Sequence, residues 1–181
     1  MQSNLTRRLV LSSLFAALIC IVTIVVRIPV PLMWSGAYIN AGDSIIYAAG
    51  VVLGGPWAAA AAGIGSALAD LLTGSSAYAP GTLVIKALMG LLVGVAAYRK
   101  PNWLLYVGVM AAAALWMMVG YAVYEFFVFA GMRIELVAAS IPSNLVQAVG
   151  GVVIGLPLAM LVRRILPENW IAAFVKKQNN Q

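Results

Sequence analysis

The sequence predicts an all-α membrane protein, a bundle of six transmembrane helices with both termini in the cytoplasm. Hydrophobic residues make up 64% of the 181 residues and charged residues 9%, and the mean hydropathy is +1.00. Six apolar runs alternate with short links, and at roughly 20 residues per spanning helix they leave no length for a soluble domain. We therefore expect a single integral membrane domain over residues 1–181.

Composition excludes several classes of function. The net charge is +6, but the basic residues stand in pairs beside apolar runs, which encodes membrane topology rather than nucleic-acid binding. A single cysteine, Cys20, rules out a disulfide within the chain. Histidine is absent, which removes histidine metal sites and histidine general bases. We expect no metal and no cofactor.

The apolar runs set the expected helix bounds. The first run follows Arg7 and Arg8 and ends without a clear small-x-small cleavage site, so it is interpreted as a retained helix rather than a signal peptide. The second and third runs are short and meet at Gly54-Gly55-Pro56, which predicts a helical hairpin. The expected helices are 9–26, 42–54, 56–72, 81–98, 103–130 and 139–166.

The longest early connection, Arg27–Ala41, contains Pro29 and Pro31, which predict irregular structure. It also contains Trp34, Tyr38 and Asn40. These side chains are typical of an aromatic belt at the membrane interface. The alternative interpretation is a loop that folds over a binding site.

The distribution of lysine and arginine predicts the orientation. With the N-terminus in the cytoplasm, the outer loops hold only Arg27 and Arg133. The inner segments hold Arg7, Arg8, Arg99, Lys100, Arg163, Arg164, Lys176 and Lys177. This asymmetry follows the positive-inside rule and places both termini in the cytoplasm.

The strongly polar intramembrane residues share one depth. Following the chain through alternating helices puts them all in the outer half, whereas a channel or proton relay would place them through the full depth. They therefore predict a cup that opens outward and binds a small heteroaromatic ligand. The expected binding residues are Trp34, Tyr38, Asn40, Asp43, Asp70, Tyr78, Lys86, Tyr121, Glu125, Asn144 and Gln147. The competing interpretation is structural: Lys86 pairs with Asp70 or Glu125, and the two amides bond between helices.

A family resemblance emerges from residues 38–94. This stretch reads YINAGDSIIYAAGVVLGGPWAAAAAGIGSALADLLTGSSAYAPGTLVIKALMGLLVG, with Asp43 after a glycine, Gly-Pro-Trp at 55–57 and Ala-Pro at 79–80. It closely resembles the membrane-embedded S components of energy-coupling-factor (ECF) vitamin transporters. Within them it is most similar to the branch around riboflavin, pyridoxine and hydroxymethylpyrimidine uptake.

The resemblance implies a mechanism, a set of partners and a location. S components bind a vitamin near the outer face, under the loop after helix one, in the bacterial cell membrane. They dock on a transmembrane T subunit carried by two cytoplasmic ATPases and topple to release the vitamin. Docking uses an Ala-x-x-x-Ala pattern on helix one. Here the matching ridges carry Ser12, Ala16 and Cys20, or Ser13 and Ala17.

The substrate and two alternative classes complete the expectations. A narrow polar cup fits pyridoxine or hydroxymethylpyrimidine, with riboflavin as the alternative. No Walker A motif is present, so ATP hydrolysis is assigned to the partners. An intramembrane enzyme would have to rely on Ser66, Lys86 and carboxylates. A stand-alone secondary transporter would usually show an inverted repeat, and none is recognisable in the sequence.

Overall fold

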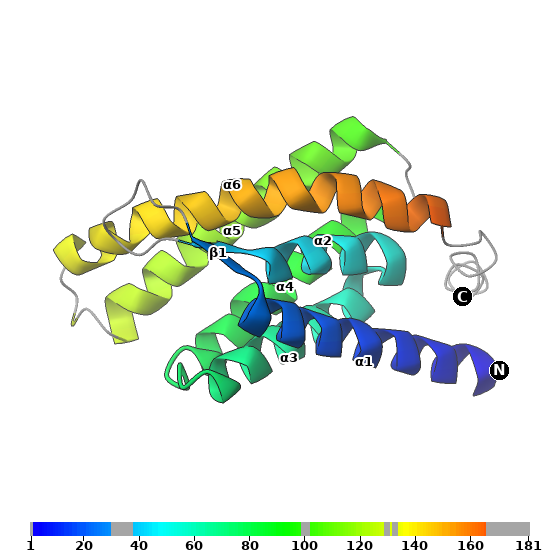
Figure 1. Cartoon of the computed structure of the whole chain (residues 1–181), viewed down its shortest axis with the longest axis horizontal. Coiled ribbons are helices and arrows are strands. Elements are labelled where there is room, and N and C mark those ends of the chain that lie inside the picture. The colour runs from blue at the N-terminus through cyan, green and yellow to red at the C-terminus, as the bar shows by residue number, and fades with distance from the viewer. Residues whose placement is uncertain (1, 30–37, 99–101, 129–130, 132–133, 166–181) are drawn as a thin grey trace.

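The computed structural model describes residues 2–29, 38–98, 102–128, 131 and 134–165. Within these ranges the chain forms six helices and one pair of short strands (Figure 1). The elements are α1 (Gln2–Val25), β1 (Arg27–Pro29), β2 (Tyr38–Asn40), α2 (Ala41–Leu53), α3 (Gly55–Leu72), α4 (Ala79–Ala97), α5 (Trp103–Val128) and α6 (Ile134–Ile165).

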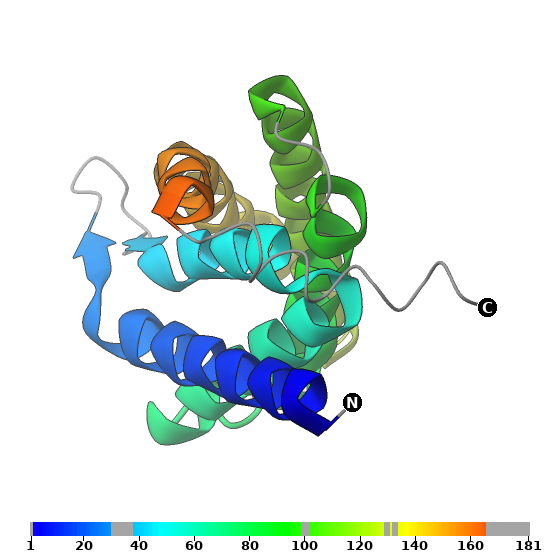
Figure 2. The same ribbon diagram turned by 90° about the vertical axis from the view of Figure 1, so that its right-hand side faces the viewer.

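Helix α2 lies at the centre of the bundle. Seen end-on, it runs between α1 and α6 (Figure 2), and it also packs against α3 and α4. Eleven of its thirteen residues are buried. A helix of 13 residues is only about 20 Å long, shorter than the ≈ 30 Å hydrocarbon core of a bilayer. The surrounding helices, rather than lipid, therefore provide its apolar environment.

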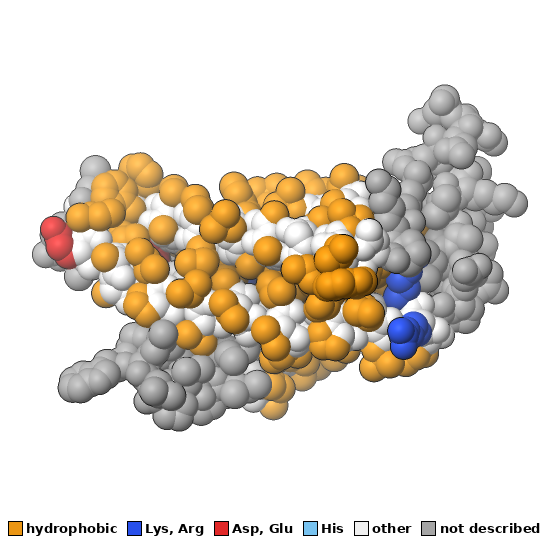
Figure 3. All heavy atoms as spheres, turned by 90° about the horizontal axis from the view of Figure 1, so that it is seen from above, with side chains coloured by type: hydrophobic (Ala, Val, Ile, Leu, Met, Phe, Trp, Pro, Cys, Tyr) orange, Lys and Arg blue, Asp and Glu red, His pale blue; other side chains and the backbone are white. Residues whose placement is uncertain are grey.

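Four of the described helices are long and apolar enough to cross a membrane. These segments are Leu5–Val25, Ala79–Ala97, Trp103–Val128 and Val137–Ile165, and α2 and α3 are not among them. Hydrophobic side chains dominate the face in Figure 3, with acidic side chains at one end and basic side chains at the other. The helical fold is confirmed, and the long apolar helices support the membrane-protein class. Six membrane-spanning segments and cytoplasmic termini stay predictions.

The two ends of the bundle differ in charge and are named here for later use. At the basic end α1 begins and α6 ends, with Arg7, Arg8, Arg163 and Arg164. At the mouth end α1, α3 and α5 end, while α2, α4 and α6 begin. Helices α5 and α6 run side by side and extend beyond the other helices there (Figure 1).

Two sequence expectations differ from the structure. The segment expected to be irregular contains an antiparallel strand pair, in which Arg27 lies opposite Asn40 and Pro29 opposite Tyr38. A two-stranded ribbon has only edge strands, which tolerate proline. Helices α1 and α6 also begin earlier than expected, at residues 2 and 134, because helical hydrogen bonding continues beyond the apolar run that the sequence marks.

The turn between α2 and α3 confirms the predicted hairpin. Gly54 has φ +79, and its N–H donates to the Gly50 carbonyl at 3.2 Å. This left-handed backbone conformation favours glycine at the end of a helix. Pro56 then occupies the first turn of α3, where its missing N–H costs no helical hydrogen bond. The chain thus reverses within a few residues at the basic end.

Helices α1 and α3 approach closely at Gly65, which yields a first testable prediction. A Cβ atom on Gly65 would lie 2.4 Å from the Ala16 carbonyl oxygen. Although an exposed helical Gly→Ala change normally stabilises by roughly 1 kcal/mol, Gly65→Ala should lower the free energy of unfolding by about 1–3 kcal/mol through overpacking. Thermal unfolding in detergent measures the change.

Gly108→Ala on α5 is the matched control, because nothing lies within 4 Å of a Cβ atom there. This variant should be as stable as the wild type or slightly more stable. Equal stability of the two variants would contradict the proposed close contact between α1 and α3.

Candidate functional site

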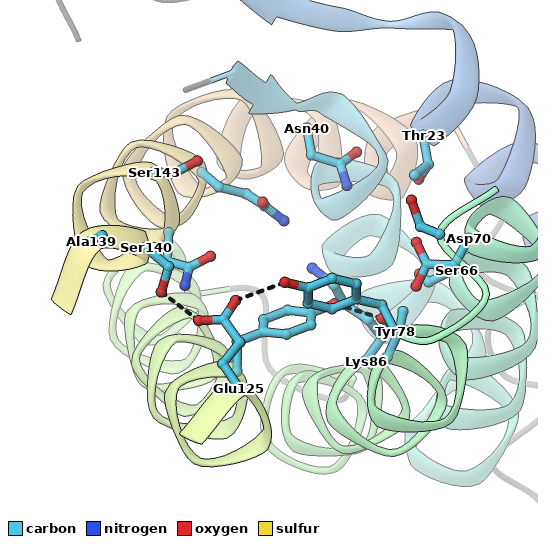
Figure 4. A pocket seen from close by; sticks show the side chains of 15 residues that line it. Thr23, Asn40, Ser66, Asp70, Tyr78, Lys86, Glu125, Ala139, Ser140 and Ser143 are labelled. Carbon is cyan, nitrogen blue, oxygen red and sulfur yellow. Dashed lines mark hydrogen bonds between the residues drawn. The ribbon is translucent and has the colours of Figure 1, made fainter. Parts of the chain in front are cut away.

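A cavity of about 340 Å³ opens at the mouth end of the bundle. Side chains from α1, α3, α4, α5, α6 and strand β2 line it (Figure 4). Eight of the predicted binding residues are among them: Asn40, Asp70, Tyr78, Lys86, Tyr121, Glu125, Asn144 and Gln147. Polar residues from distant parts of the sequence thus meet at one depth.

The cavity wall also contains residues that the predicted site omitted. Ser66, Thr82 and Ser140 lie one helical turn from Asp70, Lys86 and Asn144, so periodicity alone could have added them. Thr23 lies in the last turn of α1 and also lines the cavity. A polar residue within an apolar run was the only feature of the sequence that could have pointed to it. The remaining lining residues are Ser75, Ala139 and Ser143.

Two predicted aromatic contacts remain untested. Trp34 lies outside the described residues. For Tyr38 the structure describes the backbone, which pairs with Pro29 in the strand ribbon. Both residues therefore stay predictions as ligand contacts.

A buried ion pair forms the floor of the cavity. Lys86 Nζ lies 2.5 Å from Asp43 Oδ1, and both side chains are only 2% exposed. The sequence had pointed to Asp70 or Glu125 as the partner of Lys86, which is wrong. Helices α2 and α4 pack together and both begin at the mouth end, so their early turns place these two charges at one depth.

Other side chains complete the coordination of this pair. Gln147 donates from Nε2 to Asp43 Oδ2 at 2.7 Å, so both carboxylate oxygens accept hydrogen bonds. Lys86 Nζ also lies 3.1 Å from Met117 Sδ and 5.6 Å from the ring centroid of Tyr121, a cation–π distance. Asp43 does not line the cavity itself and acts through Lys86 and Gln147.

Glu125 is held at the rim by neutral hydroxyl groups. Ser140 donates to Glu125 Oε2, and the Tyr78 hydroxyl lies 3.5 Å from Oε1 (Figure 4). Burial and the Glu125 carboxylate raise the pKa of the Tyr78 phenol above its ordinary value. Tyr78 therefore remains a neutral donor at physiological pH.

Neighbouring contacts fix the aromatic wall. Tyr121 and Thr82 share a hydrogen bond of 3.0 Å, which links α5 to α4. Tyr124 donates to the Ala77 carbonyl at 2.6 Å and so ties α5 to the α3–α4 connection. Both tyrosine hydroxyls thus have partners within the protein, and Tyr121, which lines the cavity, adds an aromatic ring beside the polar floor.

Helix capping positions the side chain that β2 contributes to the cavity wall. Asn40 ends β2 and caps α2, accepting a hydrogen bond from the Gly42 N–H at 2.9 Å. Such caps typically stabilise a helix by ~1 kcal/mol. The side chain therefore serves the helix as well as lining the cavity.

Some polar groups of the cavity keep their hydrogen-bonding capacity. Among the described residues, the side chains of Asn144, Ser143 and Ser66 make no hydrogen bond to another protein group. Ser66 is nevertheless only 3% exposed. Ser143 and Asn144 are half-buried. Because buried polar groups normally have partners, the Ser66 hydroxyl is the strongest candidate of the three for a hydrogen bond to a bound molecule.

The chemical make-up of the cavity lining suits the binding of a polar molecule. Within the described part of the chain, no group of three or more His, Cys, Asp or Glu side chains could hold a metal ion. The lining combines carboxylates, an ammonium, hydroxyls, amides and two phenol rings. This mixture matches a heteroaromatic ring with several hydrogen-bonding substituents.

The two small-residue ridges of α1 point in different directions. Ser12 and Cys20 are only 7% and 8% exposed, on the side of α1 that packs against the other helices. Ser13 and Ala17 are exposed. They lie among the exposed large residues Leu9, Val10, Leu14, Leu18 and Ile21, and thus form a shallow depression in an apolar surface.

Two comparisons with known proteins bear on this site. The family described as ECF-type riboflavin transporter, S component, matches residues 3–164 of the chain. The chain is also similar to a Pyrococcus woesei protein described as an uncharacterized protein in the gap 3′ region. The two are 31% identical over 146 residues, covering 81% of this chain and 95% of that protein. The family match includes every described residue of the cavity.

Proposed function

Because the chain belongs to the ECF-type riboflavin transporter S component family, we propose that it captures a heteroaromatic vitamin for an ATP-driven importer. The family consists of transporter subunits rather than enzymes, which argues against the alternative of an intramembrane enzyme. The ATPases and the T subunit are separate partners in this proposal. A stand-alone secondary transporter is the competing class.

The observation that carries the proposal is a polar cavity closed beneath by the bundle core. Under Lys86 and Asp43 the core contains Tyr47, Met89 and Met117, all at most 1% exposed. This arrangement supports a subunit that binds its ligand from one side.

Arg163 contacts the Tyr106 hydroxyl at 3.2 Å, adding a polar tie between α5 and α6 towards the basic end.

The proposed orientation places the mouth end outside the cell and the basic end in the cytoplasm. Arg7, Arg8, Arg163 and Arg164 support it through the positive-inside rule. Glu135 is exposed at the opposite end. In this orientation the cavity takes up the vitamin from outside the cell. The start of α1 and the end of α6 face the cytoplasmic ATPases.

The proposed substrate is a single heteroaromatic ring with hydroxymethyl substituents, such as pyridoxine or hydroxymethylpyrimidine. The cavity of about 340 Å³ is near the lower end of ligand pockets, roughly 300–1,000 Å³. Riboflavin is the second candidate, because the family that matches is described by riboflavin transport. Tyr78 and Tyr121 supply ring faces for either ligand.

Docking on the T subunit is assigned to the exposed ridge of α1. Small residues allow helices to approach closely in a membrane, and Ser13 and Ala17 are the small residues that α1 exposes among large ones. Ser12 and Cys20 are covered by the protein itself and serve internal packing in this proposal. Ala16, the middle residue of the ridge that also contains Ser12 and Cys20, is half-buried.

A calorimetric titration tests the binding function and a specific residue. Purified protein, freed of any co-purified ligand, is titrated separately with pyridoxine, hydroxymethylpyrimidine, riboflavin and thiamine. One of them should bind saturably. Asn144→Ala should weaken that binding by about 10- to 100-fold, because loss of one buried hydrogen-bonding partner costs roughly 1–3 kcal/mol.

Asn102→Ala is the matched control for this substitution. Asn102 caps α5, accepting from the Leu104 N–H at 3.0 Å, and lies at the basic end away from the cavity. The control should lose some stability and keep wild-type affinity. Wild-type affinity in Asn144→Ala would remove that residue from the site, and binding of none of the four compounds would contradict the proposed function.

A further inference from the structure

The charged groups of the cavity are unequally compensated. Lys86 is the only cation among the described lining side chains, and its ammonium group is engaged by Asp43 at 2.5 Å. Glu125 has no cationic partner among the described residues, since its contacts are the neutral hydroxyls of Ser140 and Tyr78. The compensated charge lies at the floor, and Glu125, without a cationic partner among the described residues, lies at the rim. Asp70 adds a second lining carboxylate on the opposite side of the cavity.

Glu125 also keeps acceptor capacity towards the cavity. Ser140 occupies Oε2, whereas the Tyr78 hydroxyl is 3.5 Å from Oε1, beyond the usual range of a strong hydrogen bond. Oε1 can therefore accept a hydrogen bond from a bound molecule. Figure 4 shows Glu125 on one side of the cavity, with Ser66 and Asp70 on the other.

The helix termini at the mouth do not offset this negative charge. Helix N-termini attract anions through their free N–H groups and their dipole. In α2, however, Asn40 accepts from Gly42 and Asp43 occupies the first turn. Glu135 occupies the first turn of α6, and Pro80 in the first turn of α4 contributes no N–H. Two of the three helix dipoles that begin here thus already face a carboxylate.

From this arrangement we propose that Glu125 is a charge-selecting residue of the binding site. It accepts a hydrogen bond from a hydroxyl or protonated ring nitrogen of the ligand and repels phosphate esters. A phosphate group in this cavity would meet a carboxylate in a low-dielectric setting, where like charges repel more strongly than in water. It would find no uncommitted lysine or arginine among the described lining residues. The inference rests on the proposed vitamin-binding function.

Matched ligand pairs test the inference. Wild-type protein is titrated with pyridoxine against pyridoxine 5′-phosphate and with riboflavin against riboflavin 5′-phosphate. If pyridoxine or riboflavin binds, we expect its dissociation constant to be at least 100-fold lower than that of its phosphate ester. Glu125→Gln keeps the size of the side chain and should narrow this ratio at least tenfold. Glu135→Gln removes a carboxylate at the exposed start of α6, outside the cavity lining, and should change the ratio much less than Glu125→Gln does.

The outcomes separate the two proposals. If an alcohol binds and its phosphate ester binds within tenfold in the wild type, charge selection by the cavity is overturned while the vitamin-binding function stands. An unchanged ratio in folded Glu125→Gln overturns the role of Glu125. If no compound of either kind binds, the proposed function fails, and the inference fails with it. The wild-type comparison needs no variant, so the test holds even if Glu125→Gln does not fold.

Discussion

Lys86→Met is expected to lower the free energy of unfolding by about 3–5 kcal/mol, because it leaves a buried carboxylate without its counter-charge. Asp43 is 1% exposed, and after the substitution only Gln147 would still bond to it. Asp43→Leu should be similarly harmful, since it strands the ammonium group beneath the cavity. Thermal or denaturant unfolding in detergent, monitored by circular dichroism, measures both effects.

The double variant Asp43→Leu/Lys86→Met is the decisive control. Replacing a buried ion pair by apolar side chains of similar volume is often neutral or stabilising. The double variant should therefore recover most of the stability that either single variant loses. Single variants that stay within about 1 kcal/mol of the wild type would show that the pair is solvated or neutral. A recovered double variant that no longer binds vitamin would then assign Lys86 a separate role in binding.

Ala17→Leu is expected to reduce ATP-dependent vitamin uptake to background while leaving vitamin affinity unchanged. The added side chain fills the depression between Leu14 and Ile21 on the exposed face of α1. It would therefore keep a docking helix from approaching closely. The measurements are uptake into liposomes containing this chain, a T subunit and two ATPases, and a binding titration of the isolated chain.

Ala112→Leu on α5 is the matched control, since Ala112 is also exposed on an apolar helix. It should support wild-type uptake. Wild-type uptake by Ala17→Leu would remove the exposed ridge of α1 from the docking interface. Uptake by the chain alone, without ATPases, would instead favour the secondary transporter.

The sequence predicted the helices and the shared depth of the polar residues for one physical reason. Apolar runs must satisfy their backbone hydrogen bonds internally in a membrane, which makes helices the expected structure. Lys86, Glu125 and Gln147 then fall at one depth simply by counting residues along alternating helices. The meeting of these side chains in one cavity follows from that count and from the packing of the bundle.

The sequence could not predict which side chains of the cavity contact one another. Depth along the helices does not specify which helices are neighbours around the bundle axis or which faces they turn to one another. Asp43, Asp70 and Glu125 lie at comparable depths on three helices that all pack against α4. The rotation of each helix about its own axis decides that Lys86 meets Asp43, and depth does not predict that rotation. The start of α6 was missed for a different reason. Residues 134–138 precede the strongest apolar run and include Glu135, so hydropathy placed the start of the helix at residue 139.

The packed core beneath the cavity also bears on whether ions can leak through the protein. Among the described residues, the core under Lys86 and Asp43 is filled by tightly packed apolar side chains such as Met89 and Val93, both 0% exposed. Such packing leaves little room for a file of water molecules along the described bundle. We therefore expect an unoccupied copy of the protein to conduct neither protons nor sodium ions, which an ion-flux measurement in liposomes would check.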